Sequence, residues 1–138
     1  MTKLKTIIIA LAVLTITACS QFGMRKLPNG WYRIDDAENN IVRNKPIVTA
    51  DKFTDLRLDS GIIANNEKIY MIAGKVDNPE EFAKATEKSI GNLIGFLYDG
   101  KIICAPKINA QIDSGNFMIT FPEGTSRADA EKVFNDLR

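Results

Sequence analysis

Two cysteines are the residues of this 138-residue chain with the most distinctive chemistry. Cys19 follows two early lysines, an unbroken apolar run over residues 7–14 and the sequence Ile-Thr-Ala at positions 16–18. A basic start, a short apolar run and a small-residue cleavage site together form a secretory signal. The run is well below the roughly 20 residues that cross a bilayer, which disfavours a transmembrane helix.

A cysteine directly after such a cleavage point resembles the lipobox of bacterial lipoproteins. This resemblance implies that residues 1–18 are removed as a signal peptide and that acyl chains, such as palmitate, are attached to Cys19. The alternative is an ordinary signal peptide with a chance cysteine nearby. Ser20 is not acidic, which in many Gram-negative bacteria is compatible with transfer to the outer membrane. We therefore expect a lipid-anchored protein of the bacterial envelope, at the periplasmic face and in the outer rather than the inner membrane.

Cys104 is the second candidate. If Cys19 carries lipid, Cys104 is the only remaining thiol, so no disulfide can form within the chain. It lies in the apolar run 101–105, and a cysteine in such surroundings is typically buried and inert. The alternative is a reactive thiol, which would need a nearby cation such as Lys101 or Lys107 to lower its pKa.

The sequence lacks the residues that most other catalytic and metal-binding sites use. The chain has no histidine, and therefore lacks the commonest general base and the commonest transition-metal ligand. The acidic stretch 35–40 lacks the glycine of a calcium loop, and Ile47 stands where the bidentate glutamate would be, so we interpret the stretch as a solvated turn. No phosphate-binding glycine loop opens a helix. We predict no catalytic residue, no cofactor and no metal site.

Length and charge indicate one nearly neutral domain. Removal of residues 1–18 leaves 120 of 138 residues, which fits a single domain. Lys3 and Lys5 leave with the signal peptide, so 16 of the 18 basic residues stand against 17 acidic ones, a net charge of −1. No segment concentrates lysine or arginine, which argues against nucleic-acid binding. We predict a signal peptide over 1–18, a lipidated tether over 19–29 and a domain over 30–138.

Alternating or continuous apolar residues predict strands at 31–34, 55–59, 68–76, 93–98, 101–105 and 117–121. The strand at 68–76 is apolar on both faces, which predicts a central position with cover on each side. Asp99-Gly100 separates two apolar runs and favours the tight turn of a β-hairpin.

Capping residues predict two helices. Asn78-Pro79 with Glu81 is a typical helix start, and Gly91 is placed to end that helix. Its predicted buried face contains Phe82, Thr86 and Ile90. Ser126 caps the second helix, whose buried stripe is formed by Ala130, Val133, Phe134 and Leu137. The element order predicts the α+β class: one small domain with a mainly antiparallel sheet and two helices packed on it.

The residues around the hairpin resemble the head subdomain of the first periplasmic domain of SecD and SecDF. The segments that carry this resemblance read FAKAT at 82–86, IG at 90–91 and FLYDGKIICAPKI at 96–108. The family reads F-A-x-x-T, L-D-G-K-V and S-A-P-x-I at these places. The residues at the family's motif positions are therefore Asp99, Gly100, Ala105 and Pro106. Further similarity lies at 48–55, 112–115 and 125–130, so the resemblance spans residues 30–138.

SecD is the membrane-bound accessory of the protein-export translocase, and its head is thought to contact emerging polypeptide. The resemblance thus implies a protein or polypeptide partner and a link to protein transport. The sequence departs from the family in two ways: SecD's transmembrane helices are missing, and Cys104 replaces the serine before Ala-Pro. We expect a lipid-anchored, non-catalytic binding module of the envelope. The alternatives are a thiol-dependent enzyme that uses Cys104, or a structural lipoprotein without a discrete ligand.

Overall fold

The structure is a computed structural model that describes residues 26–39 and 41–138. The predicted signal peptide, Cys19 and the tether up to residue 25 lie outside the described residues. In the described part, no helix is both long enough and apolar enough to cross a membrane. The elements are, in chain order, β1 Gly30–Asp36, β2 Ile41–Thr49, β3 Phe53–Ile62, β4 Lys68–Val76, α2 Pro79–Lys88, β5 Ile94–Tyr98, β6 Lys101–Cys104, β7 Asn116–Thr120 and α3 Arg127–Leu137.

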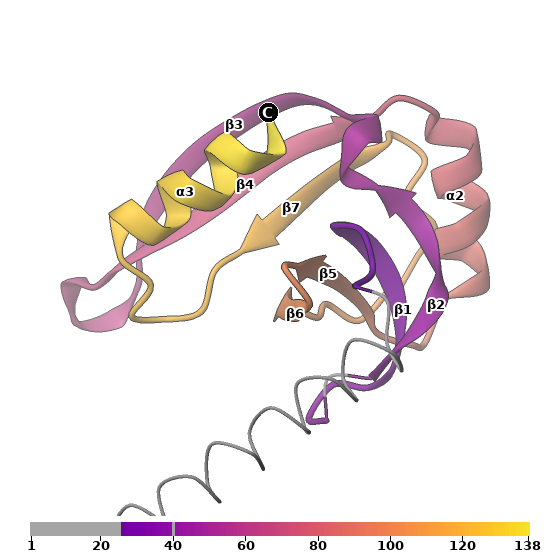
Figure 1. Ribbon diagram of the computed structural model, residues 1–138, viewed down its shortest axis with the longest axis horizontal. Helices are drawn as coiled ribbons and strands as arrows, with labels where there is room; N and C mark the ends of the chain where they lie inside the picture. The colour runs from indigo at the N-terminus through magenta and orange to yellow at the C-terminus, as the bar shows by residue number, and fades with distance from the viewer. Residues whose placement is uncertain (1–25, 40) are drawn as a thin grey trace, which may run out of the picture.

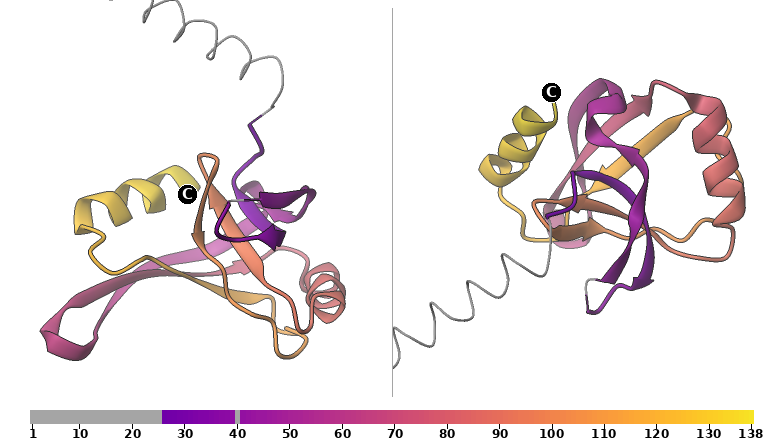
Figure 2. Two further views of the ribbon diagram at one scale, coloured as in Figure 1. Left: turned by 90° about the horizontal axis from the view of Figure 1, so that it is seen from below. Right: turned by 45° about the vertical axis from the view of Figure 1, so that its right-hand side comes forward.

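The strands form two antiparallel sheets (Figure 1). One sheet has the order β2-β1-β5-β6 and the other the order β3-β4-β7. Helix α3 covers the three-stranded sheet on the side where the four-stranded sheet also lies, and α2 flanks the other end of the domain (Figure 2). The predicted α+β class is confirmed. The strands are divided between two sheets because pairing is decided by contacts between distant segments, such as Trp31 opposite Phe96.

An aromatic cluster joins the two sheets. The ring of Trp31 in β1 meets Phe96 of its own sheet edge-on at 5.6 Å between centroids, and Phe117 of the other sheet at 5.9 Å. The ring centroids of Phe53 in β3 and Phe117 are 4.4 Å apart. Contacts of this geometry contribute about 0.5–1.5 kcal/mol each beyond the burial of the rings. They hold the sheets in a defined relative position.

Two strands differ from the sequence-based prediction. The pattern gave no sign of β2, because this strand is an edge with no fully buried residue and contains Pro46 and several register shifts. The central position of β4 is confirmed by the order β3-β4-β7. Its predicted cover on both faces is not found in the described residues: Ile72 and Val76 are buried, but Met71 on the opposite face is partly exposed.

The helix starts are confirmed. The Glu81 N–H donates to the Asn78 side chain at 3.3 Å, and the Asp129 N–H donates to the Ser126 hydroxyl at 3.1 Å. Both helices bury most of their predicted faces: in α3 Phe134 is only half-buried, and the assignment of Ile90 to α2 is wrong. The helix ends at Lys88, so Ile90 lies beyond it and is 47% exposed.

The predicted hairpin is also confirmed. β5 pairs with β6, and the two turn residues Asp99 and Gly100 have φ values of 51° and 79°. A type I′ turn requires positive φ at both central positions, which explains the use of Asp-Gly here.

Candidate functional site

A groove of about 1070 Å³ opens beside β7. One wall is the strand itself, and the other is the segment that leads from β6 past α2 to β7 (Figure 1). The floor is apolar and contains side chains from both sheets, from α2 and from this segment: Trp31, Leu56, Phe82, Ile94, Ile108 and Phe117.

The groove exists because the two sheets separate at this point. At the end of β6, the Thr120 N–H of β7 still bonds to the Cys104 sulfur. The next residues turn away and pair with the start of β5 and the chain just before it: the Ile94 N–H donates to the Pro106 carbonyl at 3.0 Å, and the Ile108 N–H to the Asn92 carbonyl at 2.9 Å. Pro106 has no N–H to offer to β7.

The edge of β7 therefore has no strand partner among the described residues. Flanking bonds establish which groups face this edge: the Phe121 N–H donates to the Tyr70 carbonyl, and the Val76 N–H to the Gly115 carbonyl, each at 3.0 Å. Because the direction of backbone groups alternates along a strand, those of Phe117 and Ile119 face β4. The N–H and C=O of Met118 point to the open edge, where Met118 lines the groove.

Trp31 supplies a second unused donor. Its side chain is 1% exposed and lies in the floor of the groove. The indole Nε1–H has no hydrogen-bond partner within the described chain. Leaving a buried donor unpaired costs about 1–3 kcal/mol, and this nitrogen is itself covered by protein atoms.

The rim of the groove carries an excess of positive charge. Arg57, Lys75 and Lys107 line it together with a single acidic residue, Asp55. All four are exposed, and none of them takes part in an ion pair within residues 26–39 and 41–138. Arg57, Ala73 and Met118 are directly opposite one another across the three strands, so their side chains share one face.

The four family-motif positions lie in two places. Pro106 lines the groove and Ala105 precedes it, half-buried. Asp99 and Gly100 form the turn at the opposite end of β6, away from the groove. Cys19, the predicted lipid attachment site, lies outside the described residues.

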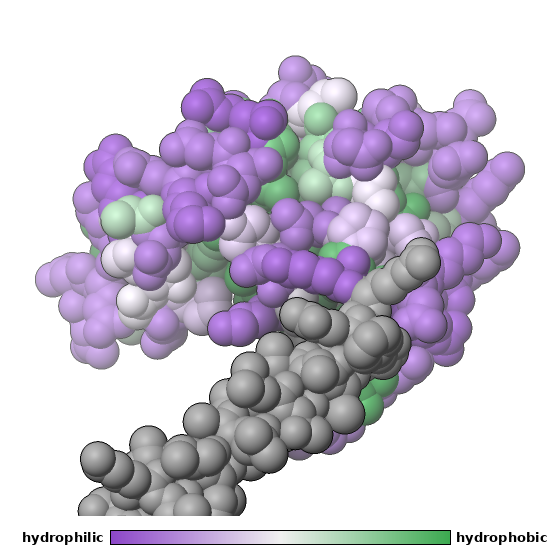
Figure 3. All heavy atoms as spheres, viewed as in Figure 1, coloured by the Kyte–Doolittle hydropathy of each residue, from purple (hydrophilic) through white to green (hydrophobic). Residues whose placement is uncertain are grey.

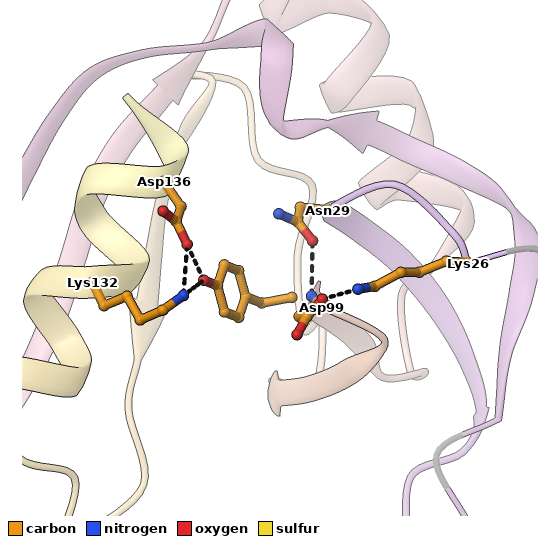
Figure 4. A network of polar contacts seen from close by, with 6 residues as sticks. Lys26, Asn29, Asp99, Lys132 and Asp136 are labelled. Atoms are coloured by element: carbon orange, nitrogen blue, oxygen red, sulfur yellow. Dashed lines mark hydrogen bonds and ion pairs between the residues drawn. The ribbon is translucent and has the colours of Figure 1, made fainter.

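Asp99 belongs to a polar cluster that joins the start of the domain, the hairpin and α3 (Figure 4). Its carboxylate pairs with Lys26, and its N–H donates to the Asn29 side chain at 2.8 Å. The bond from Lys26 lowers the pKa of the Asp99 carboxyl. On the neighbouring residue, the Tyr98 hydroxyl donates to Asp136.

Lys132 completes this cluster with contacts of 3.1 Å to both the Tyr98 hydroxyl and the Asp136 carboxylate. Burial and the bond to Asp136 raise the pKa of Tyr98. These groups fasten the hairpin to α3.

The molecular face seen in Figure 3 is largely hydrophilic, with hydrophobic residues visible in the gaps between polar ones.

The surroundings of Cys104 do not favour a reactive thiolate. Burial raises the pKa of the thiol, opposed in part by hydrogen bonds from the Thr120 and Phe96 backbones. Neither Lys101 nor Lys107 is among the groups that shift this pKa. Within the described residues, no three acidic or cysteine side chains are grouped as metal ligands would be.

Sequence reasoning missed the residues that build the groove. One signal was available: Met118 stands between the inward-facing Phe117 and Ile119, so an apolar side chain occupies an outward position. It is 51% exposed. No sequence pattern shows that Trp31, Arg57 and Lys75 meet, because they lie on three different strands.

The profile of the family "SecDF, P1 head subdomain" matches residues 29–134. The protein translocase subunit SecD of Acidaminococcus fermentans is 34% identical over 53 residues, which make up 38% of this chain and 13% of that protein. The chain thus spans only a small part of this curated relative.

Two solved SecDF structures have a similar fold. One, described as a membrane component that enhances protein export, superposes with a TM-score of 0.60 at 17% identity, covering 90% of this chain and 67% of the other. The second, SecDF in its super-membrane-facing form, gives 0.54 at 16% identity, covering 76% of this chain and 17% of the other. At this identity the likeness concerns the fold alone. Because the family profile covers most of its length, the chain belongs to the family of SecDF P1 head subdomains.

Proposed function

We propose that this protein is a lipid-anchored, non-catalytic module of the bacterial envelope that binds extended polypeptide in the groove beside β7. The observation that carries the proposal is an open strand edge at Met118 beside an apolar groove of about 1070 Å³. An extended chain can form main-chain hydrogen bonds with such an edge while placing side chains in the adjoining pockets.

The family supports polypeptide as the ligand class. The related proteins are described as a translocase subunit and as a component that enhances protein export. We extend this association to the present chain: its ligand is a polypeptide in transit or an extended segment of another envelope protein. A role as binder rather than enzyme agrees with the absence of histidine from the sequence and with the raised pKa of Cys104.

Anchoring through acyl chains on Cys19 is part of the proposal, as is a position at the periplasmic face of the outer membrane. Residues 26–29 approach the domain from the side of the four-stranded sheet, whereas β7 lies in the sheet on the far side (Figure 2, left). A tether that enters there leaves the groove directed away from the anchor. At roughly 3.3 Å per extended residue, the ten residues 20–29 let the domain stand at most about 33 Å from the membrane.

Site-specific photocrosslinking in cells tests the proposal. A photoreactive residue at Lys107 or Met118 lies at the groove, and one at Lys101 serves as the control because Lys101 is exposed but does not line it. We expect polypeptide adducts from the two groove positions and few from Lys101. Adducts only to lipid, or only to a second copy of the protein, at the groove positions would contradict polypeptide binding.

The two alternative functions gain less support. A thiol-dependent enzyme needs an accessible thiolate, and burial of Cys104 opposes ionisation. A purely structural lipoprotein has no use for an unpaired strand edge beside an apolar groove.

A further inference from the structure

We infer that the groove selects polypeptide segments in which apolar and acidic side chains alternate, and that such a segment binds as an added strand on β7. This inference rests on the proposed function, since it specifies which polypeptide that groove takes and in which conformation. Three features of the groove carry it: the open edge of β7, the apolar floor and the positive rim.

The open edge of β7 determines the conformation of the bound segment. The Met118 N–H and C=O face the groove and have no strand partner in the described part of the chain. At the end of the strand, the Thr120 N–H is already engaged by Cys104, and at the start the Asn116 N–H donates to the Ser114 hydroxyl at 3.2 Å. The docking point is therefore centred on Met118, and a segment of a few residues in extended conformation matches it.

The apolar floor of the groove determines which side chains of the bound segment fit on the inner face. Successive residues of an added strand point to opposite faces of the sheet. On the inner face they meet Phe117, Trp31 and Ile94, which are all buried and apolar. Apolar side chains fit there.

The charged rim determines which side chains of the bound segment fit on the outer face. On the outer face the added strand lies beside Met118 and Ala73, with Arg57 in the same row and Lys75 two residues further along β4, on the same face. Lys107 lies on the opposite wall. These three cations face one carboxylate, Asp55, and have no ion-pair partner within the described residues. Complementary charge therefore favours aspartate or glutamate at the outward positions.

The charge preference is tested with the purified full-length protein in detergent and two fluorescent peptides, one alternating leucine with glutamate and one alternating leucine with lysine. By fluorescence anisotropy, we expect the acidic peptide to bind about tenfold more tightly at low salt, with a smaller difference at high salt because exposed charges are screened. Arg57→Glu combined with Lys75→Glu should reverse the preference. The control, Lys84→Glu with Lys88→Glu, makes the same charge change on the exposed side of α2 and should leave it unchanged.

Strand addition is tested through the peptide backbone, which leaves the protein intact. Two versions of the acidic peptide carry N-methyl groups on either the odd or the even residues. Only the N–H groups of one set point toward β7, so one version should lose binding and the other should retain it. Met118→Pro should also abolish binding, whereas Ser60→Pro, on the free edge of β3 in the same sheet, should not.

The outcomes separate the inference from the proposed function. Equal affinity for acidic and basic peptides would overturn the charge selection, and equal affinity of both methylated peptides would overturn strand addition. Either result leaves polypeptide binding in the groove standing if the Lys107 and Met118 crosslinks form. Failure of every peptide, together with absent crosslinks at these positions, would overturn both.

Discussion

At the scale of single residues, Gly30 shows how closely β1 and β2 approach. A Cβ at this position would lie 2.3 Å from the Val48 carbonyl oxygen and 2.8 Å from the Thr49 Cα. Both are backbone atoms of the paired strand, so they cannot move aside as a side-chain tip would. We expect Gly30→Ala to destabilise the fold by about 1–3 kcal/mol, the range for overpacking, measured by urea unfolding.

Gly61 provides the matched control, because its added Cβ would have nothing nearer than the Met71 Cε at 3.6 Å. Gly61→Ala should be neutral or stabilise the fold by about 0.4–1 kcal/mol, since it restricts the unfolded chain. A Gly30→Ala protein as stable as the original would contradict the register of β1 and β2.

Cys104 predicts a pH dependence of stability. Burial raises its folded-state pKa above the ordinary value of 9.0. The thiol's contribution to stability is then fully present below the unfolded-state pKa and is lost as the pH rises through the folded-state value. Between about pH 7 and about pH 10, the parent should therefore lose more unfolding free energy than its Cys104→Ala variant.

Both proteins in this comparison carry Cys19→Ser, so that Cys104 is the only thiol, and both are unfolded with urea in detergent. The same background allows thiol labelling, which should be slow until urea is added. Rapid labelling of the folded protein would favour the thiol-enzyme alternative.

At the scale of elements, helix α2 holds one wall of the groove through Thr86. This side chain is fully buried, and its hydroxyl donates to the Ala83 carbonyl at 3.0 Å within the helix. The same hydroxyl accepts the Ile112 N–H at 3.0 Å from the segment before β7. Ile112 lines the groove, so this bond connects the helix to the site.

Thr86→Val should therefore weaken both the fold and the groove. Valine has a similar shape but no acceptor, and the unpaired Ile112 N–H should cost about 1–3 kcal/mol of unfolding free energy. Hydrogen exchange of the Ile112 amide should become faster. Thr86→Ser keeps the hydroxyl and should retain the slow exchange; equally slow exchange in the valine variant would show that this bond does not hold the wall.

At the scale of the whole molecule, the aromatic cluster of Trp31, Phe96, Phe53 and Phe117 joins the two sheets, and the groove lies where they part. The polar cluster around Asp99 fastens residues 26–29 to the hairpin and the hairpin to α3. Residues 26–29 are thus held against the hairpin, and the hairpin against α3.

Anchoring is tested by metabolic labelling with a palmitate analogue. Because Cys19 is the proposed attachment site, Cys19→Ala should abolish label incorporation and release of the signal peptide. Cys104→Ala removes the other cysteine and should change neither. Label on the Cys19→Ala protein, or its absence from the parent, would refute the lipid anchor.

The sequence alone determined the features that depend on near neighbours in the chain. The caps at Asn78 and Ser126, the Asp99-Gly100 turn and the stripe of α3 each involve residues only a few positions apart. The caps and the turn are confirmed, and so is the stripe apart from the half-buried Phe134. The α+β class followed from these elements and their order, and the family resemblance from the motif residues around the hairpin. Ile90 was misplaced because α2 ends at Lys88 with Ser89 as its C-cap, before Gly91 is reached.

The tertiary structure alone decided the division into two sheets, the pairing of β2 and the open edge of β7. These depend on contacts between segments that are far apart in the chain, and no local pattern encodes which strands will meet. The groove is the clearest case. Trp31, Arg57 and Met118 come together only because two sheets joined by an aromatic cluster separate after Cys104, where Pro106 turns the chain toward the four-stranded sheet.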